Sequence, residues 1–193
     1  LLAFLTIGWT ALEAQIPDGS TAPNFTVTDV VNGGTYTLYD LLDEGKVVYL
    51  DFFATWCGPC WSYHNSGALE GIWEEYGPPG TGEAFVIAIE SDPSTNVNCI
   101  FGPSGCVGGT QGNWAAGTPY PIADAASVAG SYQIGYYPTI MMVCPDDKKV
   151  CESGQLGTSG LWSFKEQKCV AVPVSYQVNN VKSVKCFGTN TGA

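Results

Sequence analysis

Two cysteines separated by two residues, Cys57 and Cys60, are the clearest candidates for chemistry in the sequence. They follow a nearly continuous apolar run at 47–53 and precede a segment with helical spacing, so we expect them where a buried strand meets a helix N-terminus. The backbone N–H groups and dipole of such an end stabilise a thiolate and lower the pKa of the first cysteine. The second cysteine can then attack a mixed disulfide and release the partner. The pattern predicts thiol–disulfide exchange.

The same spacing could supply half of a zinc site, which would need two further ligands. His64 is the only histidine, and the other cysteines do not repeat the two-residue spacing. The haem-attachment pattern also fails, because Trp61 follows Cys60. We therefore expect no metal and no other cofactor, and we expect His64 to pack or hydrogen-bond on the helix.

The other cysteines suit an oxidising compartment. Cys99 and Cys106 bracket a loop of Gly, Pro and Ser, and we expect them to form a disulfide. Cys144, Cys151 and Cys169 should hold one further disulfide, whose pairing the sequence leaves open.

The composition and net charge of the chain exclude some classes of binding partner. Hydrophobic residues make up 45% of the chain and charged residues 13%, which indicates a globular protein. The formal net charge is −11, and the basic residues are all lysines, so we expect no binding to nucleic acid or to anionic membranes.

The first fourteen residues are mainly apolar and end with small residues. This pattern resembles the core and cleavage site of a secretory signal, and it is too short to span a bilayer well. We expect 1–14 to be a signal-peptide remnant, and the mature protein to be secreted or periplasmic, with the cell surface as an alternative location, without stable membrane insertion.

The elements expected around the cysteines alternate between strand and helix. In chain order they are a hairpin at 25–38, a helix at 38–44, a strand at 47–53, a helix at 60–76, a strand at 84–89, a loop-rich insertion at 92–124, a helix at 125–132, strands at 139–143 and 150–153, and a helix at 161–169. This order predicts an α/β fold with a mixed central sheet flanked by helices, preceded by a β-hairpin and containing an insertion closed by a disulfide.

Two segments carry a family resemblance. The sequence DFFATWCGPC at 51–60 resembles the active-site segment of the thioredoxin superfamily, and YQIGYYPTI at 132–140 resembles its cis-proline segment. The hairpin, the helix at 38–44 and the insertion resemble the exported redoxin or TlpA-like branch. The resemblance covers about 20–169 and implies a thioredoxin-like domain that exchanges disulfides with protein thiols, using an unknown electron donor.

The resemblance also implies roles for four catalytic side chains. Cys57 would be the attacking nucleophile and Cys60 the resolving thiol. Asp51 would be a buried proton acceptor for Cys60, with a pKa raised by desolvation. Glu90 resembles a second active-site acid of the exported branch.

Five further residues would bind the substrate. Trp56 matches the exposed aromatic residue beside the nucleophile, and Gly58 and Pro59 lie between the cysteines. Pro138 would follow a cis peptide bond and face the sulfurs. The backbone of Tyr137 would pair with an extended substrate segment, as in strand addition.

The sequence departs from thioredoxin itself at two places. The strand at 84–89 lacks the lysine that accompanies the buried acid, and the helix after Cys60 lacks the usual kinking proline. Beyond the domain, 170–193 are expected to form a linker and the start of a second module. The stretch at 184–193 resembles the opening of adhesin-type repeats of gliding bacteria.

Two other functions compete with protein thiol–disulfide exchange. One is a non-catalytic, thioredoxin-like binding or adhesive module of a large surface protein, in which the CxxC disulfide is static. The other is a peroxiredoxin-like peroxidase, whose Pro-x-x-x-Thr-x-x-Cys pattern would place Pro and Thr where this chain has Leu50 and Ala54.

Overall fold

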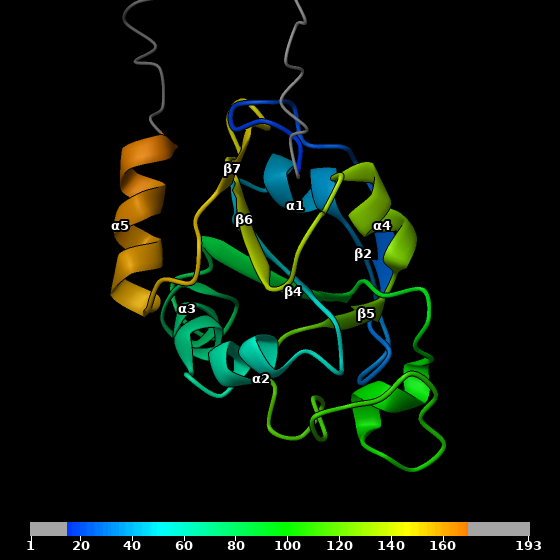
Figure 1. Ribbon diagram of the computed structural model, residues 1–193. Helices are drawn as coiled ribbons and strands as arrows, with labels where there is room; N and C mark the ends of the chain where they lie inside the picture. The colour runs from blue at the N-terminus through cyan, green and yellow to red at the C-terminus, as the bar shows by residue number, and fades with distance from the viewer. Residues whose placement is uncertain (1–14, 170–193) are drawn as a thin grey trace, which may run out of the picture.

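The computed structural model describes residues 15–169 (Figure 1). The expected signal remnant at 1–14 and the linker and second module at 170–193, with Cys186, lie outside the described residues. In chain order the elements are β1 (Thr26–Thr28), β2 (Thr35–Thr37), α1 (Leu38–Asp43), β3 (Val47–Phe53), α2 (Gly58–His64), α3 (Ala68–Tyr76), β4 (Ala84–Glu90), the 3₁₀ helix η1 (Val97–Phe101), β5 (Ile122–Asp124), α4 (Ala126–Ser131), β6 (Thr139–Val143), β7 (Val150–Glu152) and α5 (Thr158–Lys168).

A five-stranded mixed sheet forms the centre of the domain, in the order β5-β4-β3-β6-β7. β4 pairs with β3 and with β5 in parallel, whereas β6 pairs with β3 and β7 in antiparallel fashion. β1 and β2 form a separate antiparallel hairpin. All seven residues of β3 are buried, as expected for a central strand covered on both faces. The expected fold class is confirmed.

Helices cover both faces of the sheet (Figure 1), and a layer of buried apolar side chains lies on each face. α2, α3 and α5 cover one face, where they pack on alternate residues of the strands, including Tyr49, Phe53 and Val86. α1, α4 and the hairpin cover the other face, on residues that include Leu50 and Ile87. The side-chain period of two therefore assigns each strand residue to one layer.

The helix expected at 60–76 is in fact two helices. α2 ends after His64, and α3 begins after Gly67, whose φ of 75° lies in the left-handed region. An L-residue rarely adopts that conformation, so glycine marks the break. The last helix also differs from expectation, because α5 begins at Thr158 rather than at residue 161. The insertion contains η1 and ends in β5.

Two disulfides lie away from the CxxC pair. Cys99 and Cys106 are bonded, as expected. The second bond joins Cys144 to Cys169, and Cys151 is a buried free thiol within the described domain. The sequence left open which two of Cys144, Cys151 and Cys169 are bonded. The fold decides the pairing, because it brings the residue after β6, Cys144, next to the residue after α5, Cys169. Among residues 15–169, no helix has the length and apolar character needed to cross a membrane.

Candidate active site

Cys57 and Cys60 form a disulfide at the junction of β3 and α2. Cys57 is the N-cap of the helix, and its sulfur accepts a hydrogen bond from the backbone N–H of Cys60 at 3.2 Å. Pro59 occupies the first turn, where its missing N–H leaves no hydrogen bond unmade. A Cys57 thiolate at this position would be stabilised by the same N–H groups and by the helix dipole.

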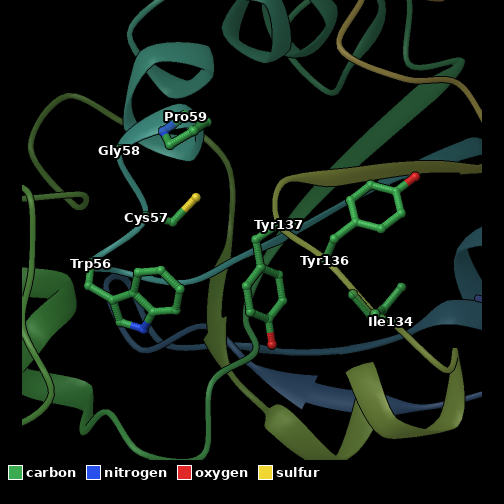
Figure 2. Close-up of a pocket in the computed structure, with 8 residues that line it drawn as sticks. Trp56, Cys57, Gly58, Pro59, Ile134, Tyr136 and Tyr137 are labelled. Atoms are coloured by element: carbon green, nitrogen blue, oxygen red, sulfur yellow. The ribbon is translucent and has the colours of Figure 1, made fainter. Parts of the chain in front are cut away.

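A cavity of about 430 Å³ opens beside Cys57 (Figure 2). It is lined by residues from two segments that are distant in sequence: Trp56, Cys57, Gly58, Pro59, Ile134, Gly135, Tyr136 and Tyr137. Cys60 is not among the lining residues, and it is buried in the apolar layer on the helix side of the sheet. A partner that enters the cavity therefore meets Cys57 first.

Aromatic side chains form the walls of this cavity (Figure 2). The indole of Trp56 is 45% exposed, and its N–H donates a hydrogen bond of 2.6 Å to Asp92. Tyr137 lies edge-on to Trp56, with 6.4 Å between ring centroids, and its hydroxyl donates to the carbonyl of Ser91. The hydroxyl of Tyr136 donates to a carboxylate oxygen of Glu152 at 2.5 Å. These bonds hold the walls in defined orientations.

The peptide bond between Tyr137 and Pro138 is cis, which is the isomer that the family resemblance implies. Pro138 is buried directly before β6 and does not line the cavity, whereas Tyr136 and Tyr137 do. The contact surface offered by this segment therefore comes from the residues before the proline.

Asp51 lies in the middle of β3 and is only 3% exposed. The alternation along β3 places it on the same face as Tyr49 and Phe53, which is the face that α2 and α3 cover. Burial raises the pKa of Asp51 to about 7, and the nearby charge of Glu70 adds to the increase. Its Oδ1 has no hydrogen-bond partner among the described residues. This carboxyl can therefore gain or lose a proton near neutral pH.

Glu90 ends β4 and is 1% exposed. Its Oε1 accepts the backbone N–H of Thr55 at 3.3 Å, and its Oε2 has no partner among residues 15–169. Burial raises the pKa of Glu90 to about 7 against the opposing effect of its hydrogen bonds. The protein thus places a second protonatable acid next to the segment that leads into Cys57.

His64 packs in an aromatic cluster. Its ring stacks on Trp61 at 5.4 Å and lies 5.1 Å from the ring of Trp114. Burial lowers the pKa of His64, so the neutral ring is favoured. Residues 15–169 contain no group of three or more His, Cys, Asp or Glu side chains arranged to hold a metal ion.

The family model described as Redoxin matches residues 17–132. The chain belongs to the redoxin family. Two relatives are the thiol-disulfide oxidoreductases ResA of Bacillus thuringiensis and Bacillus anthracis, each 30% identical over 143 residues. The match covers 74% of this chain and 73% of each relative. The expected enzyme class, a thiol–disulfide oxidoreductase, is confirmed.

Solved structures support the same fold. A putative protein disulfide isomerase from Bacteroides thetaiotaomicron aligns with a TM-score of 0.59 at 23% identity, over 79% of this redoxin and 89% of that chain. The thioredoxin domain of a thiol-disulfide oxidoreductase from Bacteroides vulgatus aligns with a TM-score of 0.56 at 21% identity, over 79% and 97% of the two chains. The redoxin therefore has a thioredoxin-like fold.

Several residues at the site of this redoxin were not predicted from the sequence. Ile134 and Tyr136 line the cavity, and both lie inside the segment that carries the proline motif, so proximity to the motif could have indicated them. Thr55 is completely buried in the short segment that joins β3 to α2. Its partners Gly109 and Gln111 come from the insertion, and no local pattern identifies them.

Proposed function

We propose that this redoxin is an exported enzyme that exchanges disulfides with polypeptides through a mixed disulfide at Cys57. The observation that carries the proposal is the asymmetry of the two sulfurs. Both cysteines are buried in the apolar layer, but only Cys57 caps the helix and lines the cavity. Only one of the two is positioned for contact with a partner.

In the reducing direction, the Cys57 thiolate attacks one sulfur of a partner disulfide, and the other partner sulfur leaves as a thiolate. Cys60 then loses its proton and attacks the Cys57 sulfur, which expels the first partner sulfur. The partner gains two electrons and two protons, and the Cys57–Cys60 disulfide described above is the product. The oxidising direction is the reverse. A second dithiol or disulfide, from an unidentified donor, returns the enzyme to its starting state.

Asp51 and Glu90 are proposed to accept the proton of Cys60. A proton acceptor works best when its pKa lies near the working pH, and both carboxyls have pKa values of about 7. Both belong to the strand face that α2 covers, because Ala88 and Phe53, two positions away along each strand, pack in that layer. The two acids differ in their hydrogen bonds. Only Glu90 accepts one from the segment directly before Cys57, from the backbone N–H of Thr55.

The partner is proposed to be an extended polypeptide segment. The cavity has backbone from 134–137 on one side and the indole of Trp56 on another, which suits a peptide that pairs with the backbone and packs side chains on aromatic surfaces. The exposed Trp56 and Tyr136 would contact residues beside the partner cysteine.

Export is supported by the two disulfides outside the CxxC pair. Cys99–Cys106 and Cys144–Cys169 each close part of the fold, and bonds of this kind persist in oxidising compartments. The signal-like pattern at 1–14 agrees with this location.

The test is a trapping experiment with the full chain. In a Cys60→Ser variant, the mixed disulfide at Cys57 cannot be resolved, so covalent adducts with exported proteins should accumulate. Non-reducing electrophoresis and mass spectrometry would identify the partners and the bonded cysteine.

The matched control is Cys57→Ser, which keeps a thiol at position 60 but removes the one that lines the cavity. We expect this variant to form no adducts above background. Equal trapping by the two variants, or no adduct with Cys60→Ser, would refute the proposed mechanism and favour a static disulfide in a binding module.

A further inference from the structure

The insertion between β4 and β5 contacts the peptide that leads into Cys57. The hydroxyl of Thr55 donates to the carbonyl of Gly109 at 2.8 Å. The carbonyl of Thr55 accepts the backbone N–H of Gln111 at 2.9 Å and the indole N–H of Trp114 at 3.2 Å. The insertion therefore satisfies the hydroxyl and the carbonyl of a fully buried residue that stands two positions before the nucleophile.

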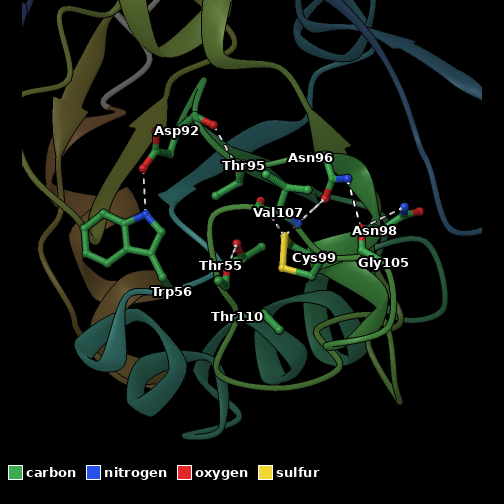
Figure 3. The surroundings of a disulfide bond; sticks show 12 residues. Thr55, Trp56, Asp92, Thr95, Asn96, Asn98, Cys99, Gly105, Val107 and Thr110 are labelled. Carbon is green, nitrogen blue, oxygen red and sulfur yellow. Dashed lines mark hydrogen bonds between the residues drawn. A yellow bond between two sulfur atoms is a disulfide. The ribbon is translucent and has the colours of Figure 1, made fainter.

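The insertion also fixes Trp56, the aromatic wall of the cavity (Figure 3). The side-chain amide of Gln111 donates to the carbonyl of Trp56 at 2.7 Å. Asp92 accepts the indole N–H, and its other carboxylate oxygen accepts the backbone N–H of Ser94 at 2.8 Å. Gly109 passes so close to Trp56 that an added Cβ would lie 3.5 Å from the Cβ of the tryptophan. Both the ring and its backbone are held from the same side.

These contacts come from two limbs of the insertion, which we define as the first limb, 92–99, and the second limb, 106–111. The disulfide between Cys99 and Cys106 joins the limbs at their far ends (Figure 3). Nearer to Trp56, Asn96 exchanges two hydrogen bonds with Val107, of 3.2 Å and 3.0 Å. At Gly108 an added Cβ would lie 2.7 Å from the carbonyl oxygen of Ser94, so the limbs are in close contact.

The disulfide is therefore linked to the active-site tryptophan by a short path along each limb. The first limb carries Asp92, and the second carries Gly109 and Gln111. If the bond between the limbs were absent, they would be held together by non-covalent contacts, among them the Asn96–Val107 pair and the bonds of Asn96 and Asn98 to the carbonyl of Gly105. Loops of this kind gain conformational freedom when a covalent closure is removed.

We propose that the insertion loop closed by Cys99–Cys106 is a positioning element of the exchange site, which fixes the orientation of Trp56 and thereby determines how well a polypeptide partner is held beside Cys57. The inference rests on the proposed exchange function. Asp92, Gln111 and the two cysteines are positioning residues, because they act through Trp56 and Thr55 rather than on the reacting sulfurs.

A kinetic experiment on the oxidised full chain separates positioning from chemistry. The protein is mixed with increasing concentrations of a single-cysteine peptide that has apolar residues beside the cysteine, or with 2-mercaptoethanol. The peptide thiolate attacks the Cys57 sulfur, a mixed disulfide forms, and Cys60 is released as a thiol. Rapid acid quenching, alkylation and mass spectrometry give the half-saturating concentration and the limiting rate.

In a Cys99→Ala/Cys106→Ala variant, we expect the half-saturating peptide concentration to rise about ten-fold, since misplacement of a contact by as little as 1 Å has effects of this order or larger. The limiting rate and the reaction with 2-mercaptoethanol should each change by less than about two-fold, because the small thiol needs no aromatic wall. A general loss of folded protein would instead lower the yield of the specific adduct with both thiols and leave the half-saturating concentration of the remaining folded molecules unchanged.

The matched control is Cys144→Ala/Cys169→Ala, which removes the other bridge and leaves the insertion intact. Its half-saturating concentration should stay within about two-fold of the parent value. All variants are assayed well below their unfolding midpoints. Asp92→Ala and Asp92→Asn provide a second test that does not depend on a disulfide, because only the asparagine keeps an acceptor for the indole. We expect weaker peptide binding with alanine and near-parental binding with asparagine.

The possible outcomes are distinct. Failure of the parent protein to form any Cys57 adduct would contradict the proposed function itself. Adduct formation with an unchanged half-saturating concentration in both Cys99→Ala/Cys106→Ala and Asp92→Ala would overturn the positioning role and leave exchange intact. A similar loss in Cys144→Ala/Cys169→Ala would also overturn it, because the effect would then not be specific to the insertion.

Discussion

At the residue scale, the two buried acids of neighbouring strands, Asp51 in the middle of β3 and Glu90 at the end of β4, have an unusual property for carboxyls in a protein. Asp51 and Glu90 are almost fully buried without a neighbouring cation, and each has one oxygen without a hydrogen-bond partner among the described residues. Burial disfavours the charged form, which is why both pKa values lie near 7. These groups therefore change protonation state in the pH range where exchange enzymes work.

The resolving step should depend on pH through these acids. In their proposed role as proton acceptors for Cys60, they would work only when ionised, so the rate of mixed-disulfide resolution should rise with pH and level off above about 7. Glu90→Gln should lower the rate at pH 8 by about 10–100-fold and remove one ionisation from the profile. Stopped-flow measurement of product release would show this. Asp147→Asn, on the β6–β7 turn, is the control and should leave the profile unchanged.

The same burial affects stability, and its sign follows from the raised pKa. Asp51 binds its proton more tightly in the folded state, so its contribution to the free energy of unfolding is present at pH 4 and is lost as the pH rises to about 7. Asp51→Asn cannot ionise and should remove this loss. We expect the variant to gain roughly 2–4 kcal/mol relative to the parent between pH 4 and pH 8. Urea denaturation at both pH values would measure it, and parallel curves for the two proteins would contradict it.

At the element scale, the break between α2 and α3 separates the helix that carries the cysteines from the helix that packs on the sheet. α2 has only seven residues, so its N-terminus, with Cys57 as the cap, is fixed by the turn around Gly67 as well as by its own packing. The left-handed backbone of Gly67 makes that turn possible.

Substitution of Gly67 tests the importance of this turn. An alanine at φ 75° meets no neighbouring atom, so the cost should come from the backbone alone, about 1–2 kcal/mol. Gly130, in α4, is a matched control because it also has open space around it but has helical geometry. Gly130→Ala should be neutral or stabilise by up to about 1 kcal/mol. Thermal unfolding of both variants would show opposite shifts, and equal shifts would contradict the assignment.

Local sequence patterns predicted the elements better than the connections between them. The apolar run of β3 and the CxxC spacing are local signals, and the structure places both as expected. The apolar spacing of α3 continues in phase from α2, so periodicity alone could not reveal the break at Gly67. The Cys144–Cys169 pairing and the bonds from the insertion to Thr55 depend on tertiary distances that no local pattern encodes.

At the scale of the whole molecule, the net charge is strongly negative. The formal net charge is −11 with seven lysines and no arginine, and two half-buried acids, Asp92 and Glu152, accept hydrogen bonds from Trp56 and Tyr136 of the cavity wall. A surface of one sign attracts oppositely charged partners and raises their rate of encounter, and salt weakens this effect.

Partner charge should therefore influence the rate of exchange. A single-cysteine peptide with lysines two positions from the cysteine should react several-fold faster than its glutamate counterpart at low ionic strength. The difference should shrink at about 0.5 M salt, where screening is nearly complete. Stopped-flow rates for the two peptides across a salt series would measure it. Equal rates at low salt would show that the acidity serves solubility alone.

The bond between Cys144 and Cys169 has a mechanical consequence for a chain that continues to residue 193. Cys169 follows the last turn of α5, and Cys144 follows β6, which pairs with the central strand β3. Tension applied to the polypeptide after Cys169 passes through a covalent link into the middle of the sheet, so it cannot peel α5 away first. A load applied there would thus reach the domain at the end of β3 opposite to the cavity.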